Sequence, residues 1–300
     1  MRLVRRFPIN ALEKGTFKEF IFSSNNWLVA SFTRGVMIWN MESKELVRDL
    51  GKINSISKNF KYVGQYEKGF NTPSEIKIFE LATNRIVYQD LNVHKYAVKN
   101  IYFTPDSTRF LIHTYSESIK VFDIQTGQEL REFYIIPYSE SIESKATQLK
   151  FHIGESREYL LCNGNRYTRL YDLSKGELEH AFKHDHSSPA RSIAFTKDGA
   201  TLLTGNDNGD ILWWRTKDGL LLKSLKASLY PVNALDVSSV SLAAVGQSFR
   251  DDPNVYIYDL EGNEKTSFKA GKQSCSGVRF SPDGKYVAIA SDDGIYYCQI

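Results

Sequence analysis

The sequence predicts an all-β fold made of seven similar units, each with four short antiparallel strands. Three observations predict it: an aromatic-polar pair recurs at the end of an apolar strand, turn signals recur around it in constant order, and apolar and polar residues alternate between the turns. Such alternation is typical of half-buried strands, as in Ile76-Lys77-Ile78-Phe79. No stretch shows sustained helical spacing, so we expect strands throughout.

The aromatic-polar pairs set the period of the units. They are spaced 40 to 49 residues apart, close to the period of about 40 to 45 residues that four strands per propeller blade require. Seven such units account for the 300 residues, so we expect residues 1–300 to form a single domain, a seven-bladed β-propeller. The pairs are Trp39-Asn40, Phe79-Glu80, Phe122-Asp123, Tyr171-Asp172, Trp214-Arg215 and Tyr258-Asp259, with a weaker counterpart at Cys298-Gln299.

Two kinds of turn recur in the units. Pro presets the backbone of a turn, Asp bonds the backbone locally, and Gly takes positive φ, so both kinds predict tight connections. The turn between the first two strands reads Thr104-Pro105-Asp106-Ser107, Thr196-Lys197-Asp198-Gly199 and Ser281-Pro282-Asp283-Gly284. The hairpin turn after the aromatic-polar pair contains Thr126-Gly127, Lys175-Gly176, Asp218-Gly219 and Glu261-Gly262.

The two ends of the chain predict how the fold closes. Leu3-Val4-Arg5-Arg6-Phe7 repeats the pattern of Leu46-Val47-Arg48-Asp49-Leu50, the last strand of the first unit, whereas the sequence stops at Ile300, one strand short of a complete last unit. We therefore expect the N-terminal strand to complete the last blade as its fourth strand. This pairing covers a strand edge that would otherwise recruit other chains.

With these landmarks in place, the whole chain resembles the WD-repeat β-propeller family. The strongest matches run from His94 to Asp123 and from Asp185 to Trp214. Members of that family often link a His, a Ser or Thr, an Asp and the Trp in a hydrogen-bonded tetrad. The resemblance implies a structural role for His94 in the third unit and for His186, Thr204 and Trp214 in the fifth.

The tetrad is incomplete in both units. Asn208 stands where the Asp belongs in the fifth unit, and Phe122 replaces Trp in the third, which removes the indole donor. We therefore expect a divergent member whose blades are held mainly by packed aromatic and β-branched side chains.

Composition limits the partners and the compartment. With 38 basic and 35 acidic residues the formal net charge is +3, which provides no global field for nucleic acid or an acidic membrane. No apolar stretch follows the basic start, and none reaches the length of a membrane span. The three cysteines, Cys162, Cys275 and Cys298, lack pairing or metal spacing. We expect free, buried thiols and a cytoplasmic location.

The sequence holds little that points to catalysis or a cofactor. His180, His184, Asp185 and His186 fall within seven residues, but no second ligand group of matching spacing occurs, so we predict no metal and no cofactor. Pairs such as Asp251-Asp252 lie in predicted turns, where Asp is common for backbone reasons. No G-x-S-x-G, P-loop or H-E-x-x-H motif occurs, and we expect no enzyme.

Loop lengths indicate one binding face. In a four-stranded meander, the second-to-third connections and the connections to the next blade emerge on one face, and the long excursions at residues 66–73, 134–145 and 247–254 all belong to this set. Arginines and aromatics gather there, and both are enriched in protein interfaces. The candidate partner-binding residues are Phe32, Arg34, Tyr66, Phe70, Tyr138, Arg166, Tyr167, Tyr230, Phe249 and Arg250.

Three functions stay open at this point. The first is a non-enzymatic scaffold, monomeric by itself, that binds other proteins on this face and works as a subunit of a complex. The second is a propeller that binds phosphoinositides or other acidic lipids, for which Phe32-Thr33-Arg34-Gly35 is a partial echo of a paired-arginine motif. The third is an enzyme using the central channel, which the apolar first strands such as Ile193-Ala194-Phe195 argue against. We favour the scaffold.

Overall fold

The computed structural model describes residues 1–9, 14–23, 26–66, 74–93, 98–135, 148–153, 158–164, 167–184, 188–246, 254–272 and 274–300. Contacts divide the chain into two compact units, of which unit 1 comprises residues 1–13, 146–172 and 178–300 and unit 2 comprises residues 14–145 and 173–177. The described strands, β1 to β28, form seven four-stranded antiparallel sheets, which confirms the predicted all-β fold of seven propeller blades.

Unit 2 contains three of the sheets. Sheet 1 consists of β2 (Phe17–Phe22), β3 (Trp27–Phe32), β4 (Gly35–Asn40) and β5 (Glu45–Leu50). Sheet 2 consists of β6 (Ser55–Ile56), β7 (Tyr62–Tyr66), β8 (Ser74–Glu80) and β9 (Ile86–Val93). Sheet 3 consists of β10 (Val98–Phe103), β11 (Arg109–Thr114), β12 (Ser118–Asp123) and β13 (Glu129–Tyr134).

The other four sheets lie in unit 1. Sheet 4 consists of β14 (Gln148–Ile153), β15 (Glu158–Asn163), β16 (Tyr167–Asp172) and β17 (Glu177–Lys183), and sheet 5 of β18 (Ala190–Phe195), β19 (Thr201–Asn206), β20 (Asp210–Arg215) and β21 (Leu221–Lys226). Sheet 6 consists of β22 (Val232–Val237), β23 (Leu242–Gly246), β24 (Val255–Tyr258) and β25 (Glu264–Phe268). Sheet 7 consists of β26 (Cys275–Phe280), β27 (Tyr286–Ser291), β28 (Gly294–Gln299) and β1 (Arg2–Phe7).

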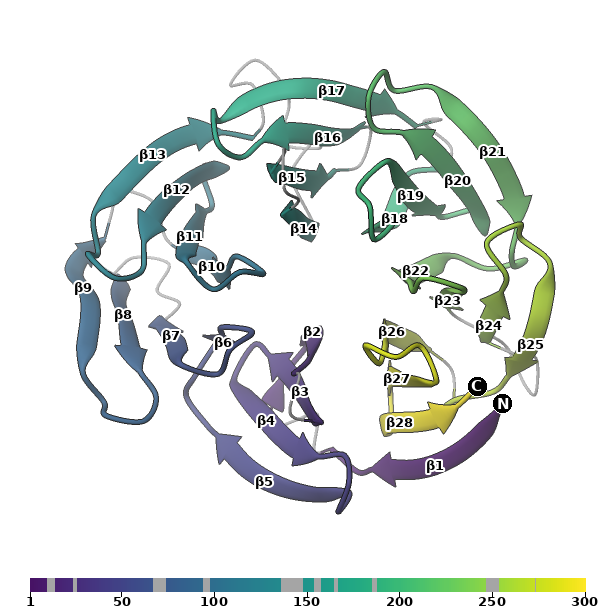
Figure 1. The fold of residues 1–300 in the computed structure, drawn as a ribbon, viewed down its shortest axis with the longest axis horizontal. Helices are drawn as coiled ribbons and strands as arrows, with labels where there is room; N and C mark the ends of the chain where they lie inside the picture. Colours follow the sequence, from purple (N-terminus) through teal and green to yellow (C-terminus); the bar gives the residue numbers. More distant parts are fainter. Residues whose placement is uncertain are drawn as a thin grey trace. The chain divides into compact units, whose positions relative to one another are not determined.

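The N-terminal strand completes the last sheet, as predicted. β1 pairs antiparallel with β28, with Arg2 opposite Gln299 and Phe7 opposite Ile295 (Figure 1). Phe7 is buried while the other residues of β1 are exposed or half-buried, so one side chain anchors the strand and the backbone ladder holds it. The edge of β28 is thereby covered by the other end of the chain.

Each sheet has two unlike ends. At one end, the connections between first and second strands and between third and fourth strands are always four or five residues long. We call this the short-turn end. At the other end, the connections between second and third strands and from the fourth strand to the next sheet range from two to 13 residues, and we call this the loop end. The predicted excess of long connections at one end is confirmed.

Backbone hydrogen bonds join the two turns at the short-turn end. The residue that follows the third strand donates its N–H to a carbonyl in the turn between the first two strands, as from Ile124 to Thr108 at 3.0 Å and from Thr216 to Ala200 at 3.0 Å. The same bond runs from Leu81 to Lys61. The repetition explains why the turn signals recur at fixed offsets in the sequence.

The core lies between neighbouring sheets of each unit. In unit 2, Val29 and Ile38 of sheet 1 pack against Ile56 and Val63 of sheet 2. Sheet 3 contributes Phe110 and Phe122, which stack with ring centroids 4.8 Å apart. A phenylalanine at the family's Trp position is therefore accommodated by aromatic stacking, which replaces the missing indole donor with packing.

Candidate functional site

The loop ends of the sheets are the candidate site, and their two sets of connections contact each other directly. In sheet 1, Arg34 donates its backbone N–H to Lys14 O at 3.0 Å. In sheet 3, Ile135 donates to Glu117 O at 2.9 Å, and in sheet 7 Asp292 donates to Ser274 O at 3.1 Å. In these three sheets, the connection to or from an adjacent sheet is therefore fixed by the turn between the second and third strands.

The structure places the ten predicted partner-binding residues in three groups. Arg34 is exposed, and Tyr167 and Tyr230 are half-buried at loop ends. Phe32 and Tyr66 each expose only 4% of their surface, so the structure puts them in the core instead of at the predicted binding surface. The remaining five, Phe70, Tyr138, Arg166, Phe249 and Arg250, lie outside the described residues.

Phe32 and Tyr66 are buried for different reasons. Phe32 ends β3, and its ring lies edge-on to Phe17 at a centroid distance of 5.9 Å. Tyr66 ends β7, and its hydroxyl donates to Lys99 O at 2.8 Å, so the polar tip is satisfied inside the unit. Burial holds the pKa of the Tyr66 phenol well above its ordinary value.

A polar group that sequence reasoning missed surrounds Tyr66. The Lys18 ammonium on β2 donates to Asn100 Oδ1 on β10 at 2.6 Å and lies 3.4 Å from the Tyr66 hydroxyl. It also lies 5.4 Å from the centroid of the Tyr66 ring, a cation–π distance. Three sheets of unit 2 therefore meet in one polar contact, and two of its residues, Lys18 and Asn100, stand on first strands, which were expected to be mostly apolar.

The turn between β11 and β12 is held by a buried ionic group. Glu117 has φ of 60° and is only 6% exposed. Its carboxylate lies 2.9 Å from Nε2 of buried His113 and accepts from Lys99 Nζ at 2.8 Å. Burial lowers the pKa of His113, and the hydrogen bonds from His113 and Lys99 lower the pKa of Glu117 against the opposing effect of its own burial.

A second ionic contact was also missed, between sheets 6 and 7 of unit 1. Asp236 on β22 is 8% exposed, and its carboxylate accepts from Arg279 Nη1 at 2.9 Å and from the backbone N–H of Phe280 at 2.7 Å. Neither residue belongs to a motif, since the two are 43 positions apart in the sequence. The only feature of the sequence that relates Asp236 to Arg279 is that each stands on the first strand of its repeat, and the two repeats are successive.

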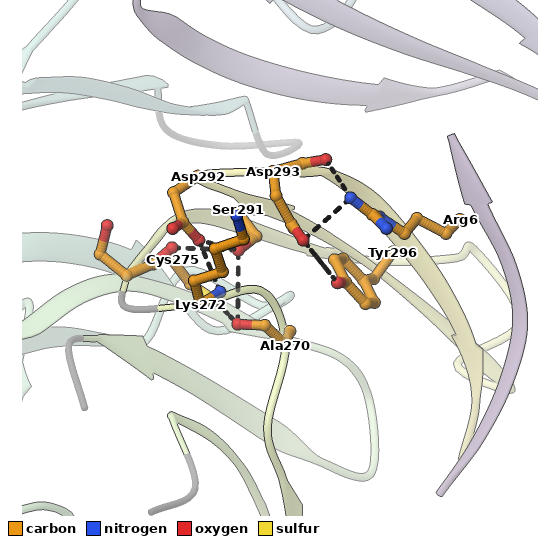
Figure 2. A network of polar contacts seen from close by, with 9 residues as sticks. Arg6, Ala270, Lys272, Cys275, Ser291, Asp292, Asp293 and Tyr296 are labelled. Carbon is orange, nitrogen blue, oxygen red and sulfur yellow. Dashed lines mark hydrogen bonds and ion pairs between the residues drawn. The ribbon is translucent and has the colours of Figure 1, made fainter. Parts of the chain in front are cut away.

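The loop end of sheet 7 contains the network drawn in Figure 2. Arg6 on β1 donates to Asp293 O at 2.8 Å and forms an ion pair with Asp293 Oδ2 at 2.9 Å. Tyr296 donates to the same carboxylate at 3.1 Å. The side chain of Asp293 therefore ties the N-terminal strand to the turn between β27 and β28.

The other half of this network fixes the connection from β25 to β26. Asp292 Oδ1 accepts from the Lys272 N–H at 3.0 Å (Figure 2). Ser291 Oγ donates to Ser274 O at 3.1 Å. Gly271 has φ of 69°, and a Cβ there would overlap Ser291 Oγ, so only glycine fits. These contacts are structural: the carboxylates of Asp292 and Asp293 each accept from a backbone or side-chain donor of the same loop end.

The three cysteines are free and buried, as predicted. Burial raises the pKa of the Cys275 and Cys298 thiols to about 12. A thiol with such a pKa stays protonated near neutral pH and is a poor nucleophile. The cysteines therefore act as small core residues.

The histidine cluster is only partly within the described residues, since Asp185 and His186 lie outside them, as does His94. His180 is bonded to Lys217 O at 2.8 Å, whereas His184 is buried and lies 2.7 Å from Thr168 Oγ1. In the part of the chain that the structure describes, no group of three or more His, Cys, Asp or Glu side chains could hold a metal.

The implied tetrad of sheet 5 is present in part. Trp214 Nε1 donates to Thr204 Oγ1 at 3.2 Å, which is the contact that the resemblance implied. Asn208 does not take the place of the missing Asp, because its Nδ2 donates to Asp210 Oδ2 at 2.7 Å and its Oδ1 accepts from the Asp210 N–H. It closes its own turn instead.

One exposed side chain escaped the sequence analysis. Leu229, in the connection from β21 to β22, exposes 83% of its surface, the largest fraction of any large hydrophobic residue among those described. It stands beside Tyr230 at the loop end of sheet 5. A lone Leu between Ser and Tyr has no periodic pattern, so the sequence carried no signal for its exposure.

In the described ranges, no helix has the length and apolar character required to cross a membrane.

Comparisons with known proteins point to one family. The model of the WD domain, G-beta repeat, matches residues 176–215 and 262–297. The human pre-mRNA-processing factor 17 is 24% identical over 232 residues, covering 73% of this chain and 38% of the relative, and the Saccharomyces cerevisiae protein of that name is 22% identical over 220 residues, covering 71% and 47%. The serine-threonine kinase receptor-associated protein of Gallus gallus is 25% identical over 243 residues, covering 67% of this chain and 66% of the relative.

The chain spans less than half the length of these pre-mRNA-processing factors. Their names give no support to the predicted cytoplasmic location. The first matched repeat runs from Gly176 to Arg215 and so covers β17 of sheet 4 and the first three strands of sheet 5, and the second ends in β28. Together with the seven four-stranded sheets, the two matched repeats and these relatives support the resemblance to the WD-repeat β-propeller family.

Proposed function

We propose that this protein is a non-enzymatic scaffold that binds other proteins at the loop ends of its sheets. The observation that carries the proposal is the difference in connection length between the two ends of the sheets. Connections have four or five residues at every short-turn end, but two to 13 residues at the loop ends. Variable connections on a constant framework are where repeat proteins place their binding surfaces. Arg34, Tyr167 and Tyr230 supply interface-type side chains there.

The relatives support the same class of function. One is named as a receptor-associated protein and others as processing factors, and an association with another protein is what a scaffold provides. Of the buried ionic contacts described above, that of Glu117 with Lys99 fixes a turn within sheet 3 and that of Asp236 with Arg279 joins sheets 6 and 7, and both carboxylates are already engaged by neighbouring donors. Their geometry fits a structural role better than catalysis. That the chain forms one domain and is monomeric by itself also belongs to this proposal.

The test is affinity purification from the native cell with three baits. The wild type is compared with a loop-end variant, Arg34→Glu with Tyr167→Ala and Tyr230→Ala, and with a control changed at short-turn ends, Lys197→Glu with Leu220→Ala and Leu260→Ala. We expect mass spectrometry to find proteins that the wild type and the control retain and the loop-end variant loses. Equal recovery with all three baits would argue against the proposed surface.

The same three proteins also distinguish binding to acidic lipid from binding to a protein partner. The Lys14 ammonium next to Arg34 is paired with Asp49 Oδ1 at 2.5 Å, which lowers the positive charge at the loop end of sheet 1. We therefore expect no flotation with phosphatidylserine vesicles. Flotation of the wild type that is lost in the loop-end variant would favour lipid binding over the scaffold.

A further inference from the structure

Leu229 is held out in water by the loop that carries it. The neighbouring exposed leucines of sheet 5, Leu221 and Leu222, expose 46% and 48% of their surfaces, against 83% for Leu229. Leaving a leucine side chain in water instead of burying it forgoes about 1.5 to 3 kcal/mol. The loop that carries Leu229 has hydrogen bonds that fix its backbone with the side chain in this exposed position.

The hydrogen bonds of residues 227–231 account for this fixed exposure. Gly209 O, in the turn between β19 and β20, accepts from the backbone N–H groups of Ala227 at 3.0 Å and Ser228 at 3.2 Å. Tyr230 N donates to Ser228 Oγ at 3.0 Å, and Lys226 Nζ donates to Asn208 O. Ala227, the first residue of this loop, is buried at 6% exposure. The loop is therefore attached to the turn between β19 and β20 on the N-terminal side of Leu229, and the bond from Tyr230 to Ser228 spans Leu229 itself.

Gly209 fits directly against this loop. Its φ is 88°, and an added Cβ would overlap Ser228 O and lie 2.9 Å from Tyr230 O. The close approach of the two backbones needs glycine, because any side chain would push the loop away. Gly209 therefore sets the position from which Leu229 projects.

The charges around the loop are balanced. Arg191 Nε pairs with Asp207 Oδ1 at 2.7 Å, and Lys226 Nζ pairs with Asp210 Oδ1 at 3.4 Å. Anionic lipid is attracted by unpaired cations, and these cations are neutralised by carboxylates. An apolar projection inside a polar, neutral rim has instead the anatomy of a protein interface. Because Leu229 projects, the complementary surface must be concave.

We propose that Leu229 inserts into an apolar pocket of a folded protein partner, with Tyr230 beside it and the two ion pairs at the rim. This inference deepens the proposed function and depends on it, because it names the part of the loop ends that makes the central contact. Tyr230 supplies the aromatic area that interfaces favour. The loop is already ordered, so docking costs little conformational entropy.

The experiment uses the purified full chain and each protein that the wild type retains in the affinity purification, produced separately. Dissociation constants are measured for the wild type, Leu229→Asp, Leu229→Met and Val240→Asp. Val240 is the matched control, since it is 57% exposed but lies at the short-turn end of sheet 6. We expect Leu229→Asp to weaken binding by about tenfold or more, as the loss of one buried leucine predicts, and the other two variants to bind like the wild type.

Unchanged binding of Leu229→Asp would overturn the inference while leaving the scaffold proposal intact. Failure of every purified protein to bind even the wild type would sink the scaffold proposal and this inference with it. Two further results would overturn the inference in favour of another binding partner. Flotation with vesicles of phosphatidylcholine and phosphatidylserine that Leu229→Asp abolishes would indicate a membrane, and self-association in light scattering that Leu229→Asp removes would indicate a second copy of this chain.

Discussion

Thr204 and Trp214 carry the one tetrad contact that the described residues retain. The hydrogen bond of 3.2 Å joins two buried side chains on adjacent strands of sheet 5. Trp214 also packs against Phe182 of sheet 4, with ring centroids 5.6 Å apart. The indole thus serves both as a donor within its sheet and as packing between sheets.

Replacing Trp214 by Phe keeps most of the packing but leaves Thr204 Oγ1 buried without its donor. We expect the free energy of unfolding to fall by about 1 to 2 kcal/mol, measured by urea denaturation. Thr204→Val should lower the free energy of unfolding by less in the Trp214→Phe background than in the wild type, because the hydrogen-bond partner of Thr204 is already absent there. Additive effects in this double-mutant cycle would mean that the bond contributes nothing.

His184 has a defined tautomer. Asn163 Nδ2 donates to Ala190 O at 3.0 Å, so its Oδ1 accepts the proton of Thr168 Oγ1 at 2.9 Å. Thr168 Oγ1 can then only accept, and His184 Nε2 must donate to it at 2.7 Å. Nδ1 is left as a bare acceptor, with no partner among the described residues. The buried imidazole is therefore neutral, and burial lowers its pKa to about 4.

This residue predicts a pH dependence of stability. The unfolded chain binds a proton at His184 near pH 6.5, and the folded protein binds it only near pH 4. The contribution of neutral His184 to the free energy of unfolding is fully present above pH 6.5. It is lost as the pH falls toward 4, by on the order of 2 to 3 kcal/mol. We expect the difference in unfolding free energy between wild type and His184→Gln to shrink by this amount between pH 7 and pH 4.

The control for this measurement is His180→Gln, since His180 bonds Lys217 O at the surface. The same measurements on His180→Gln show whether the loss of any histidine produces such a change. His113 also has a pKa lowered by burial, but it is present in both proteins and cancels in the difference. A constant difference for His184→Gln would show that the imidazole takes up its proton equally easily in the folded protein.

At the scale of single elements, β1 is the strand with the most consequence. It supplies the fourth strand of sheet 7 from the far end of the sequence, and its backbone covers the edge of β28. The exposed ion pair of Arg6 with Asp293 adds little by itself, because solvent screens such pairs. The strand is held by its ladder and by Phe7.

Deleting residues 2–7 should therefore have a different effect from Arg6→Ala. We expect the deletion to lower the melting temperature and to produce oligomers in size-exclusion chromatography, because the bare edge of β28 pairs with other chains. Arg6→Ala should stay monomeric and lose less than about 1 kcal/mol. A monomeric deletion variant with unchanged melting temperature would contradict the role given to β1.

The elements show what the sequence could and could not predict. The period, both kinds of turn and the pairing of the chain ends were predictable, because each depends on local residues repeated at fixed offsets. Phe32 and Tyr66 were misplaced because burial depends on what neighbouring strands contribute, here Phe17 on the adjacent strand for Phe32 and Lys99 of sheet 3 for Tyr66. The contacts of Lys18 with Asn100 and of Asp236 with Arg279 join distant positions and leave no motif.

At the scale of the whole molecule, the question is whether the two contact-defined units unfold together. The three cysteines all lie in unit 1, and Trp27 and Trp39 lie in unit 2. The buried thiols, of which Cys275 and Cys298 have pKa values raised to about 12, react only when unit 1 opens. Each unit thus carries its own reporter.

A single domain predicts one shared transition. In a Trp213→Phe, Trp214→Phe variant, the remaining tryptophan fluorescence reports unit 2 and the reaction of the thiols with an aromatic disulfide reports unit 1. We expect both signals to change at the same urea concentration, as for one cooperative domain. Val240→Cys in the same background is the positive control for labelling before unfolding, since position 240 is exposed. Two separate midpoints would divide the chain into two domains.

The paired turns at the short-turn ends also constrain how this chain can diverge. An extra residue between β10 and β11 would displace the carbonyl of Thr108 from the N–H of Ile124, and so would an extra residue on the other partner. Such changes would have to occur in both turns at once to keep the bond, which is a rare double event. We therefore expect insertions to be rare at the short-turn ends, and differences in loop length to be confined to the loop ends.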